Sequence, residues 1–207
     1  MATLIKRGAE AEIYLSEWMG RKVIVKKRIR KKYRIKEIDD ELRKRRTKKE
    51  GVLMAGARKA GVAVPVIYDV DMDGMKITMQ YVDGKSLKDC LDEMDIDEQK
   101  NVCRKIGESI AFLHKNGIVH GDITTSNLIL YGDNVYFIDF GLGEKSSEDE
   151  KRGVDLHLLR GAFKAAHKNS NLFEWVFESY RRNYHGADSI TKKMEEIAGR
   201  GRYVVRG

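Results

Sequence analysis

The chain of 207 residues has little cysteine, a single proline and no long apolar run. Its two cysteines, Cys90 and Cys103, form no CxxC pair and have no histidine cluster beside them, so neither a disulfide framework nor a zinc site is predicted. No stretch approaches about eighteen apolar residues, and residues 1–7 run directly into charge, which argues against a membrane span or a signal peptide. We therefore expect a soluble cytoplasmic protein with reduced thiols. Because Pro65 is the only proline, no motif that needs a later proline can be present.

Positive charge is concentrated in two segments of a chain whose formal net charge is +8. Lysine and arginine dominate residues 26–49, and a second basic segment occupies residues 200–206. A basic run is often only a solvated helix face. Two such segments in one chain favour contact with phosphates or with an acidic partner.

The first third of the chain predicts strands followed by one long helix. Residues 12–18 alternate with period two, and residues 22–26 form a short apolar run after a turn at Gly20, which indicates a hairpin. Residues 35–60 are rich in good helix formers, and Gly61 should end that helix.

Further along, residues 65–70 and 75–82 flank Asp73-Gly74, a two-residue hairpin signal. Together with the earlier strands they predict a five-stranded sheet with one helix over residues 1–82.

The rest of the chain is mostly helical in pattern. Apolar residues recur at helical spacing within residues 97–115, and short strands are expected at 128–131 and 135–138. Only helical patterns follow. The predicted fold class is α+β with two lobes: a mostly β lobe at 1–82 and a reduced, mostly helical lobe at 83–207, joined by a hinge near residues 80–85.

Two short motifs indicate phosphoryl transfer. His120-Gly121-Asp122 precedes Asn127 in a loop between the predicted helix and hairpin, and Asp139-Phe140-Gly141 follows the hairpin. Such transfer needs a carboxylate that orients the acceptor hydroxyl and oxygen ligands that hold Mg²⁺ on the phosphates of ATP. Asp122 suits the first role as catalytic residue, and Asn127 with Asp139 suits the second as metal ligands. Asp-Phe-Gly alone is a weak signal, but both motifs at this spacing are specific; His120 is assigned a structural role.

A lysine that binds phosphates and a glutamate that orients it are also required. Lys26 ends a buried apolar run, where an unpaired charge would be costly, so it is the candidate for this catalytic and nucleotide-binding role. Glu50 is favoured over Glu41 as its partner, because it precedes an apolar helical stretch. The alternative for Glu50 is a solvent-facing pair with Arg46.

The remaining nucleotide contacts are predicted by position. Gly8-Ala9-Glu10-Ala11 joins the first two strands and contains one glycine, so its backbone N–H groups could face phosphates. Met79 and Tyr81, near the expected hinge, would lie beside the adenine.

These residues resemble the protein kinase superfamily, and within it the small RIO-like atypical kinases of the Bud type, the kinase and ATPase subunits of the KEOPS complex. The resemblance runs over nearly the whole chain. Besides the motifs above, it includes Lys31-Lys32-Tyr33-Arg34, Val154-Asp155-Leu156 and Arg200-Gly201-Arg202.

Departures from ordinary protein kinases also favour a small atypical kinase. No Ala-Pro-Glu can follow Phe140, and Gly121 stands where those kinases have an arginine that pairs with a phosphorylated activation loop. Residues 142–151 leave no room for a peptide-docking platform. Asp155, expected to open the next helix, either braces the catalytic loop, residues 120–127, or simply supplies a helix N-terminal charge.

The resemblance implies an Mg²⁺-ATP enzyme that autophosphorylates or phosphorylates serine and threonine. It also implies an ATPase partner for the threonylcarbamoyl-transferring subunit and the small accessory subunits of KEOPS, which support threonylcarbamoyladenosine formation on tRNA. The basic start of the long helix and the basic tail would then face tRNA or that subunit. Two alternatives stay open: a small-molecule kinase of the aminoglycoside or choline type, and a non-catalytic ATP-binding scaffold on RNA.

Overall fold

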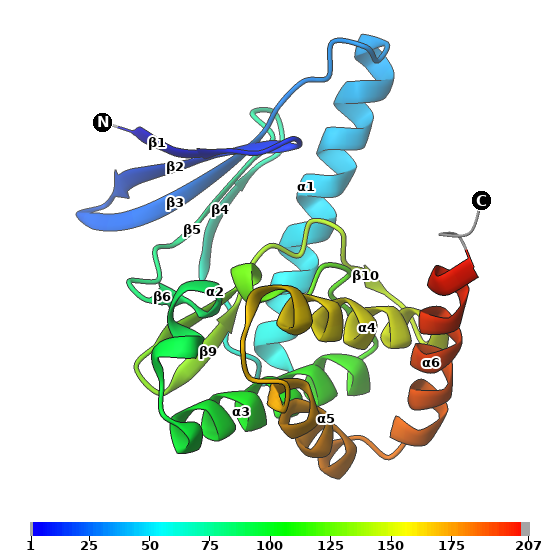
Figure 1. Cartoon of the computed structure of the whole chain (residues 1–207). Helices are drawn as coiled ribbons and strands as arrows, with labels where there is room; N and C mark the ends of the chain where they lie inside the picture. Colours follow the sequence, from blue (N-terminus) through cyan, green and yellow to red (C-terminus); the bar gives the residue numbers. More distant parts are fainter. Residues whose placement is uncertain (1, 204–207) are drawn as a thin grey trace.

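Five antiparallel strands form one end of the molecule (Figure 1). The computed structural model describes residues 2–203, with side-chain surroundings as far as residue 199, so the basic tail at 200–206 lies outside the side chains described. The strand order is β1-β2-β3-β5-β4. The strands are β1 (Thr3–Arg7), β2 (Ala11–Trp18), β3 (Arg21–Arg28), β4 (Ile67–Asp71) and β5 (Lys76–Gln80). The predicted five-stranded sheet is confirmed.

Two turns of this sheet differ in how well the sequence predicted them. Met19 and Gly20 both have positive φ, 50° and 74°, and form the tight β2–β3 turn expected at Gly20. The β4–β5 connection is longer than the predicted two-residue hairpin, because Asp71 pairs directly with Lys76 and four residues lie between them. The Asp71 carboxylate accepts hydrogen bonds from the N–H groups of Asp73 and Gly74, which stabilises the longer loop.

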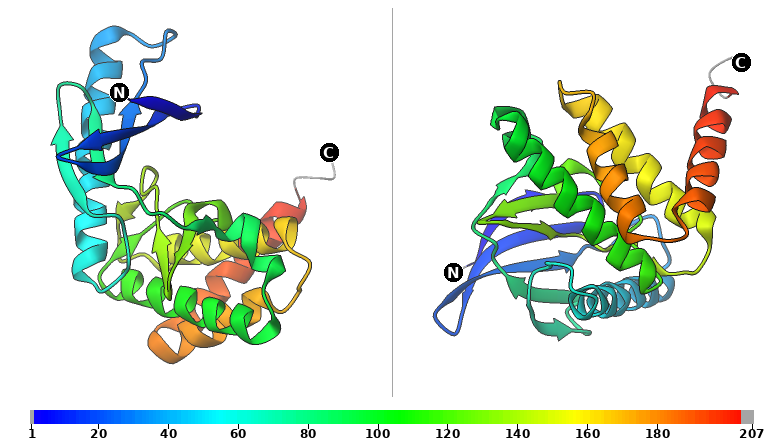
Figure 2. Two further views of the ribbon diagram at one scale, coloured as in Figure 1. Left: turned by 90° about the vertical axis from the view of Figure 1, so that its left-hand side faces the viewer. Right: turned by 90° about the horizontal axis from the view of Figure 1, so that it is seen from below.

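One long helix, α1 (Lys36–Lys59), connects the sheet to the other end of the molecule (Figures 1 and 2). It packs against β4 and β5, while Gly56 in its last turns lies against Ile118, far along the chain. The helix ends as expected at Gly61, whose φ is +87°. The N–H of Gly61 donates to the carbonyl of Arg58 and that of Val62 to Ala57, the paired arrangement that satisfies the last carbonyls of a helix.

The second half is mostly helical. Its helices are α2 (Leu87–Cys90), α3 (Ile96–Lys115), α4 (Asp149–Ala166), α5 (Leu172–Asn183) and α6 (Ala187–Tyr203). Asp95 and Glu98 form a capping box that fixes the start of α3. α3 packs along α5, and α4 packs along α6.

Short strands complete this half. The expected hairpin is β8 (Leu128–Tyr131) and β9 (Asn134–Phe137), and β6 (Lys85–Ser86) extends it beside β8. The sequence predicted only helices after residue 138, and this is wrong: β10 (Glu144–Lys145) pairs with β7 (Ile118–Val119). Just before β10, the N–H of Gly143 donates to the carbonyl of Phe140, and the chain there passes beside the carbonyls of Val119 and His120.

A single core runs through both halves. Leu53 of α1, Ile77 of β5, Ile110 of α3 and Phe137 of β9 belong to one buried apolar cluster. The predicted boundary at residue 82 falls between β5 and β6. Across residues 2–203, no helix is both long and apolar enough to cross a membrane.

Candidate active site

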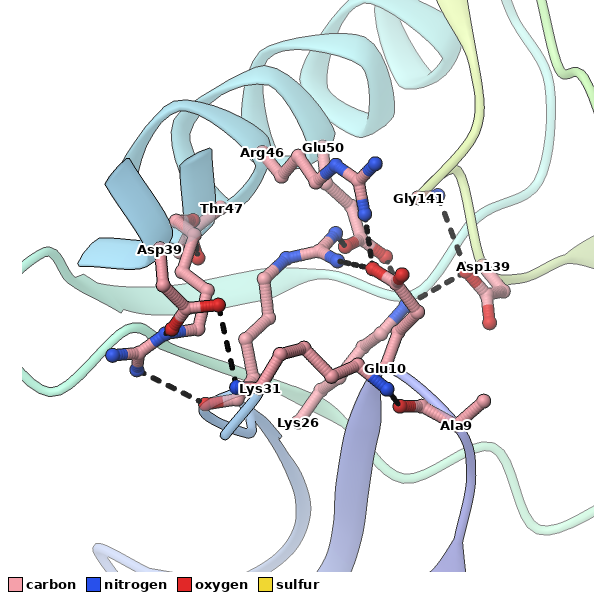
Figure 3. A network of polar contacts seen from close by, with 12 residues as sticks. Ala9, Glu10, Lys26, Lys31, Asp39, Arg46, Thr47, Glu50, Asp139 and Gly141 are labelled. Atoms are coloured by element: carbon pink, nitrogen blue, oxygen red, sulfur yellow. Dashed lines mark hydrogen bonds and ion pairs between the residues drawn. The ribbon is translucent and has the colours of Figure 1, made fainter. Parts of the chain in front are cut away.

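Lys26 lies at the centre of the sheet, where β3 is paired on both sides by β2 and β5. Its side chain is almost fully buried, and its Nζ lies 2.6 Å from Glu50 Oε1 and 2.7 Å from Asp139 Oδ1 (Figure 3). Glu50 is therefore the partner of Lys26, as predicted, and Glu41 is exposed on α1. Burial by itself would lower the pKa of Lys26, but the two carboxylates raise it above its ordinary value, so the ammonium stays charged.

Arg28 is a second buried cation that the sequence reasoning missed. It lies two residues after Lys26 on β3, and side chains at that spacing project from the same face of a strand. Arg28 Nη2 lies 2.6 Å from Glu50 Oε2, so the two oxygens of Glu50 bind the two cations. The alternation of β3 was the signal that could have found it.

Asp139 has a backbone φ of +64°, a left-handed conformation that non-glycine residues seldom adopt. Its Oδ1 accepts a hydrogen bond from the N–H of Gly141 at 3.1 Å, in addition to that from Lys26. Burial by itself would raise the pKa of this carboxyl, but the charge of Lys26 and these hydrogen bonds hold it below its usual value. Asp139 is therefore ionised at neutral pH.

Asn127 binds Asp122 twice. Its Nδ2 donates to the backbone carbonyl of Asp122 at 2.9 Å and to the carboxylate Oδ2 at 3.0 Å. These bonds fix the direction of the Asp122 carboxylate, and they occupy the amide nitrogen of Asn127. The amide oxygen is then the atom of this side chain that could bind a metal ion.

His120 connects the catalytic loop to the segment before Asp139. Its Nε2 lies 3.1 Å from the carbonyl of Ile138, and the N–H of Asp122 donates to its Nδ1 at 3.3 Å. These partners require a neutral ring with the proton on Nε2. Burial lowers the pKa of His120, although the charge of nearby carboxylates acts to raise it. The net lowering of the pKa favours the neutral form. His120 also packs on Phe140, with ring centroids 4.4 Å apart, and these contacts support its structural role.

Asp155 lies in the second turn of α4 and does not open that helix as expected from the sequence. Its carboxylate is fully buried and accepts hydrogen bonds from the N–H groups of His120 and Gly121, each at 2.7 Å. The helix-terminal explanation is therefore wrong, and Asp155 braces the catalytic loop. The brace requires glycine at 121, because its φ is +80° and a Cβ there would lie 2.6 Å from the carbonyl oxygen of Leu142.

The loop at residues 8–11 is tied to its surroundings. The N–H of Gly8 donates to the carbonyl of Ala11 at 2.9 Å, so this group closes the turn and does not face a ligand, contrary to expectation. Lys31 binds the carbonyl of Ala9, and Glu10 forms an ion pair with Arg46 of α1 (Figure 3).

Two cavities meet at Lys26 and Asp139. One, of about 350 Å³, is walled mainly by apolar side chains and includes Met79, Tyr81 and Asn127. The other, of about 270 Å³, lies under the loop at 8–11 and includes the remaining predicted residues. Its lining contains Gly8, Ala9, Glu10, Ala11, Arg28, Asp122 and Gly141. The structure thus brings the predicted site residues to one cleft.

The donors in the cleft fit a magnesium ion carried by phosphates. In residues 2–203, no group of three or more histidine, cysteine or acidic side chains is placed to hold a metal. Mg²⁺ commonly takes only one or two protein oxygens, with water and substrate phosphates completing its shell. The Asp139 carboxylate and the Asn127 amide oxygen supply that number.

Comparison with known proteins places this geometry in context. The protein kinase domain family matches residues 5–162. The chain is similar to the KEOPS complex subunit Bud32 of Pyrococcus abyssi, with 47% identity over 97% of this chain and 96% of the relative. It is 42% identical to a probable serine/threonine-protein kinase BUD32 homolog of Archaeoglobus fulgidus, over 96% of this chain and 95% of that protein. It is also 42% identical to a probable bifunctional tRNA threonylcarbamoyladenosine biosynthesis protein of Methanobrevibacter smithii, but spans only 36% of it.

Proposed function

The chain belongs to the protein kinase family and to its Bud32 group, and from that premise we propose an ATP-dependent serine/threonine kinase and ATPase that supports tRNA threonylcarbamoylation in a KEOPS complex. The observation that carries the catalytic part is the meeting of Asp122, Asn127 and Asp139 with the Lys26–Glu50 pair in one cleft. The names of the similar proteins support the biological part.

We propose that the adenine binds in the larger cavity, beside Met79 and Tyr81. The phosphates of ATP extend out of this cavity, and Lys26, oriented by Glu50, binds them there. Asn127 and Asp139 hold Mg²⁺, which neutralises charge on the phosphates when it is bound.

Asp122 orients the attacking group, either a serine or threonine hydroxyl or a water molecule. As the attacking oxygen bonds to the terminal phosphorus, the bond from that phosphorus to the bridging oxygen of ADP breaks. The proton of the attacking group passes to the Asp122 carboxylate. The hydrogen bond from Asn127 Nδ2 to Oδ2 holds that carboxylate in place, which supports this role.

Phosphate release from ATP tests this assignment. We expect Asp122→Asn and Asp139→Ala each to lower turnover by at least about a hundredfold, because the first removes the group that accepts the proton and the second removes a proposed ligand of Mg²⁺. Asp133→Asn is the matched control, since Asp133 is a fully exposed turn residue outside the cleft. Unchanged turnover in both cleft variants, in protein that remains folded by circular dichroism, would refute the enzymatic function.

The basic loop, defined as residues 29–35, is the proposed contact with tRNA. Tyr33 is 78% exposed, and the guanidinium of Arg34 lies 5.3 Å from its ring. Buried Asp39 accepts hydrogen bonds from the N–H of Lys31 and from Arg43, which fixes the loop on α1. Exposed cations around an aromatic ring suit phosphates and bases.

We also propose a cytoplasmic location and contact of the tail at 200–206 with tRNA or the threonylcarbamoyl-transferring subunit.

An ATPase assay with and without the other KEOPS subunits and tRNA tests the biological part. We expect turnover to rise when both are added and to stay low with either alone. The same rate in all four mixtures would contradict a function inside the complex.

A further inference from the structure

We propose that Arg28 is a second phosphate-binding residue of the cleft and that its guanidinium binds the terminal phosphate of ATP. This inference rests on the proposed ATP-dependent function and adds a contact that the Lys26–Glu50 pair does not supply.

The position of Arg28 along the cleft identifies the phosphate. The cavity that contains Met79 and Tyr81 includes Lys26 but not Arg28. The adjoining cavity contains Arg28 together with Asp122. A nucleotide whose base lies in the first cavity therefore passes Lys26 before it reaches Arg28, and the group that arrives there is the last phosphate.

Arg28 and Lys26 face the same point of the cleft wall. A Cβ built on Gly141 would lie 3.3 Å from Arg28 Nη2 and 3.5 Å from Lys26 Nζ. The wall beside Asp139 is thus within reach of two cations. A triphosphate carries more negative charge than one lysine balances, and two adjacent cations in a buried site attract it more strongly.

The guanidinium of Arg28 has N–H groups without a hydrogen-bond acceptor among the described residues. Arg28 is 5% exposed, and Nη2 donates to Glu50. Its Nη1 lies 4.0 Å from Glu10 Oε2, beyond hydrogen-bond distance, and its Nε is buried without a partner. An arginine has five N–H donors in a planar fork that suits phosphate oxygens. A phosphate group between Arg28 and Glu10 would provide the missing acceptors.

Glu10 can give way to that phosphate. Its side chain is 44% exposed and paired with Arg46 on the outer surface of α1, whereas Glu50 is buried. The inner partner, Glu50, therefore keeps Arg28 in position while the outer one moves.

A purely structural role for Arg28 makes a different prediction. If Arg28 only braces Glu50, its loss would disturb Lys26 and weaken every nucleotide that carries phosphate. If it binds the terminal phosphate, its loss would weaken the triphosphate alone. The number of phosphates on the ligand separates the two roles.

The test is calorimetric titration of adenosine, ADP and a non-hydrolysable ATP analogue, each with Mg²⁺, into wild type, Arg28→Gln and Arg28→Lys. We expect Arg28→Gln to weaken the ATP analogue by at least about tenfold and ADP by less than about threefold, because a charge-assisted bond to one phosphate is lost. Arg28→Lys should recover part of that loss, since it keeps the charge but not the fork. Arg45→Gln is the control, because it makes the same change at an exposed arginine of α1 that lines neither cavity; it should bind all three ligands as wild type does.

Three results would overturn the inference: equal weakening of ADP and the ATP analogue, no change in either, or the same selective loss in Arg45→Gln. If Arg28→Gln does not fold, the ratio of ADP to ATP-analogue affinity in Arg28→Lys decides, and a ratio equal to that of wild type counts against the proposal. Failure of the wild type to bind any nucleotide would instead refute the proposed function itself.

Discussion

The Asp155 carboxylate binds the backbone N–H of His120 at 2.7 Å and that of Gly121 at the same distance, although α4 follows the catalytic loop by a long stretch of chain. The Asp155 carboxylate is itself held in place by two further buried side chains. His114 Nε2 lies 3.3 Å from its Oδ2, and the Tyr180 hydroxyl lies 2.9 Å from His114 Nδ1. Side chains from α3, α4 and α5 thus form one buried polar chain that ends at the catalytic loop.

Removal of this brace should cost both stability and activity. Asp155→Ala would leave two buried N–H groups without an acceptor, and each such group costs about 1–3 kcal/mol. We expect a loss of about 2–5 kcal/mol in the free energy of unfolding, measured with urea, and slower phosphate release in the protein that remains folded. Glu148→Ala removes an exposed acid just before α4 and is the control, with an expected change below about 1 kcal/mol. Equal losses in the two variants would argue against the brace.

Glycine at position 121 should be required for space as well as for conformation. Gly121 and Gly132 both have positive φ, +80° and +55°, but a Cβ at 121 meets the Leu142 carbonyl whereas one at 132 meets no atom within 4 Å. Gly132→Ala should therefore cost only the left-handed conformation, about 1–2 kcal/mol. We expect Gly121→Ala to cost more than this in urea unfolding and to lower turnover, because the loop must move away from Leu142. Similar unfolding midpoints for the two variants would show that the loop yields without strain.

Local patterns in the sequence were enough for much of the fold. β2 follows from period-two alternation and β3 from a short apolar run after a turn, and α1 follows from a long run of helix formers and the glycine that ends it. The Lys26–Glu50 pair was also predictable, because a lysine after an apolar run needs an anion and Glu50 precedes an apolar stretch of α1.

The parts that were missed depend on contacts between distant residues. β7 and β10 have two residues each, too few for any periodicity, and exist only because the fold brings them together. The brace by Asp155 was one of two expected roles, and the choice between them depends on the packing of α4 beneath the catalytic loop, which no local pattern encodes. Arg28 was hidden in a basic run whose other members are mostly exposed, and only its strand register sets it apart.

His120 should make the protein less stable in mild acid. Burial lowers its pKa below the ordinary value of 6.5, so between the folded and unfolded pKa values the unfolded chain binds a proton that the folded chain does not. Stability from this residue is therefore present above about pH 6.5 and falls as the pH drops below it. We expect the urea midpoint of wild type to fall more steeply between about pH 7.5 and 5.5 than that of His120→Asn. His185→Asn, a change at an exposed histidine, should keep the wild-type slope; parallel curves for all three proteins would contradict the burial effect.

The basic loop should bind tRNA through its position and not through net charge alone. Arg30 and Lys32 of the basic loop and Lys36, the first residue of α1, are exposed, whereas Lys88, Lys164 and Lys168 are exposed on the helical half. Replacing either set of three by alanine removes the same charge. Each cation that neutralises a phosphate adds about 0.7–0.9 to the slope of log affinity against log salt.

We therefore expect the loop variant to bind tRNA more weakly at low salt, with a slope shallower by about 2–3, and the control variant to differ little from wild type. Fluorescence anisotropy of labelled tRNA at several salt concentrations measures both quantities. Equal loss of affinity in the two variants would mean that only the overall charge attracts the RNA. Loss of affinity without a change in slope would instead assign the effect to contacts that do not involve phosphates.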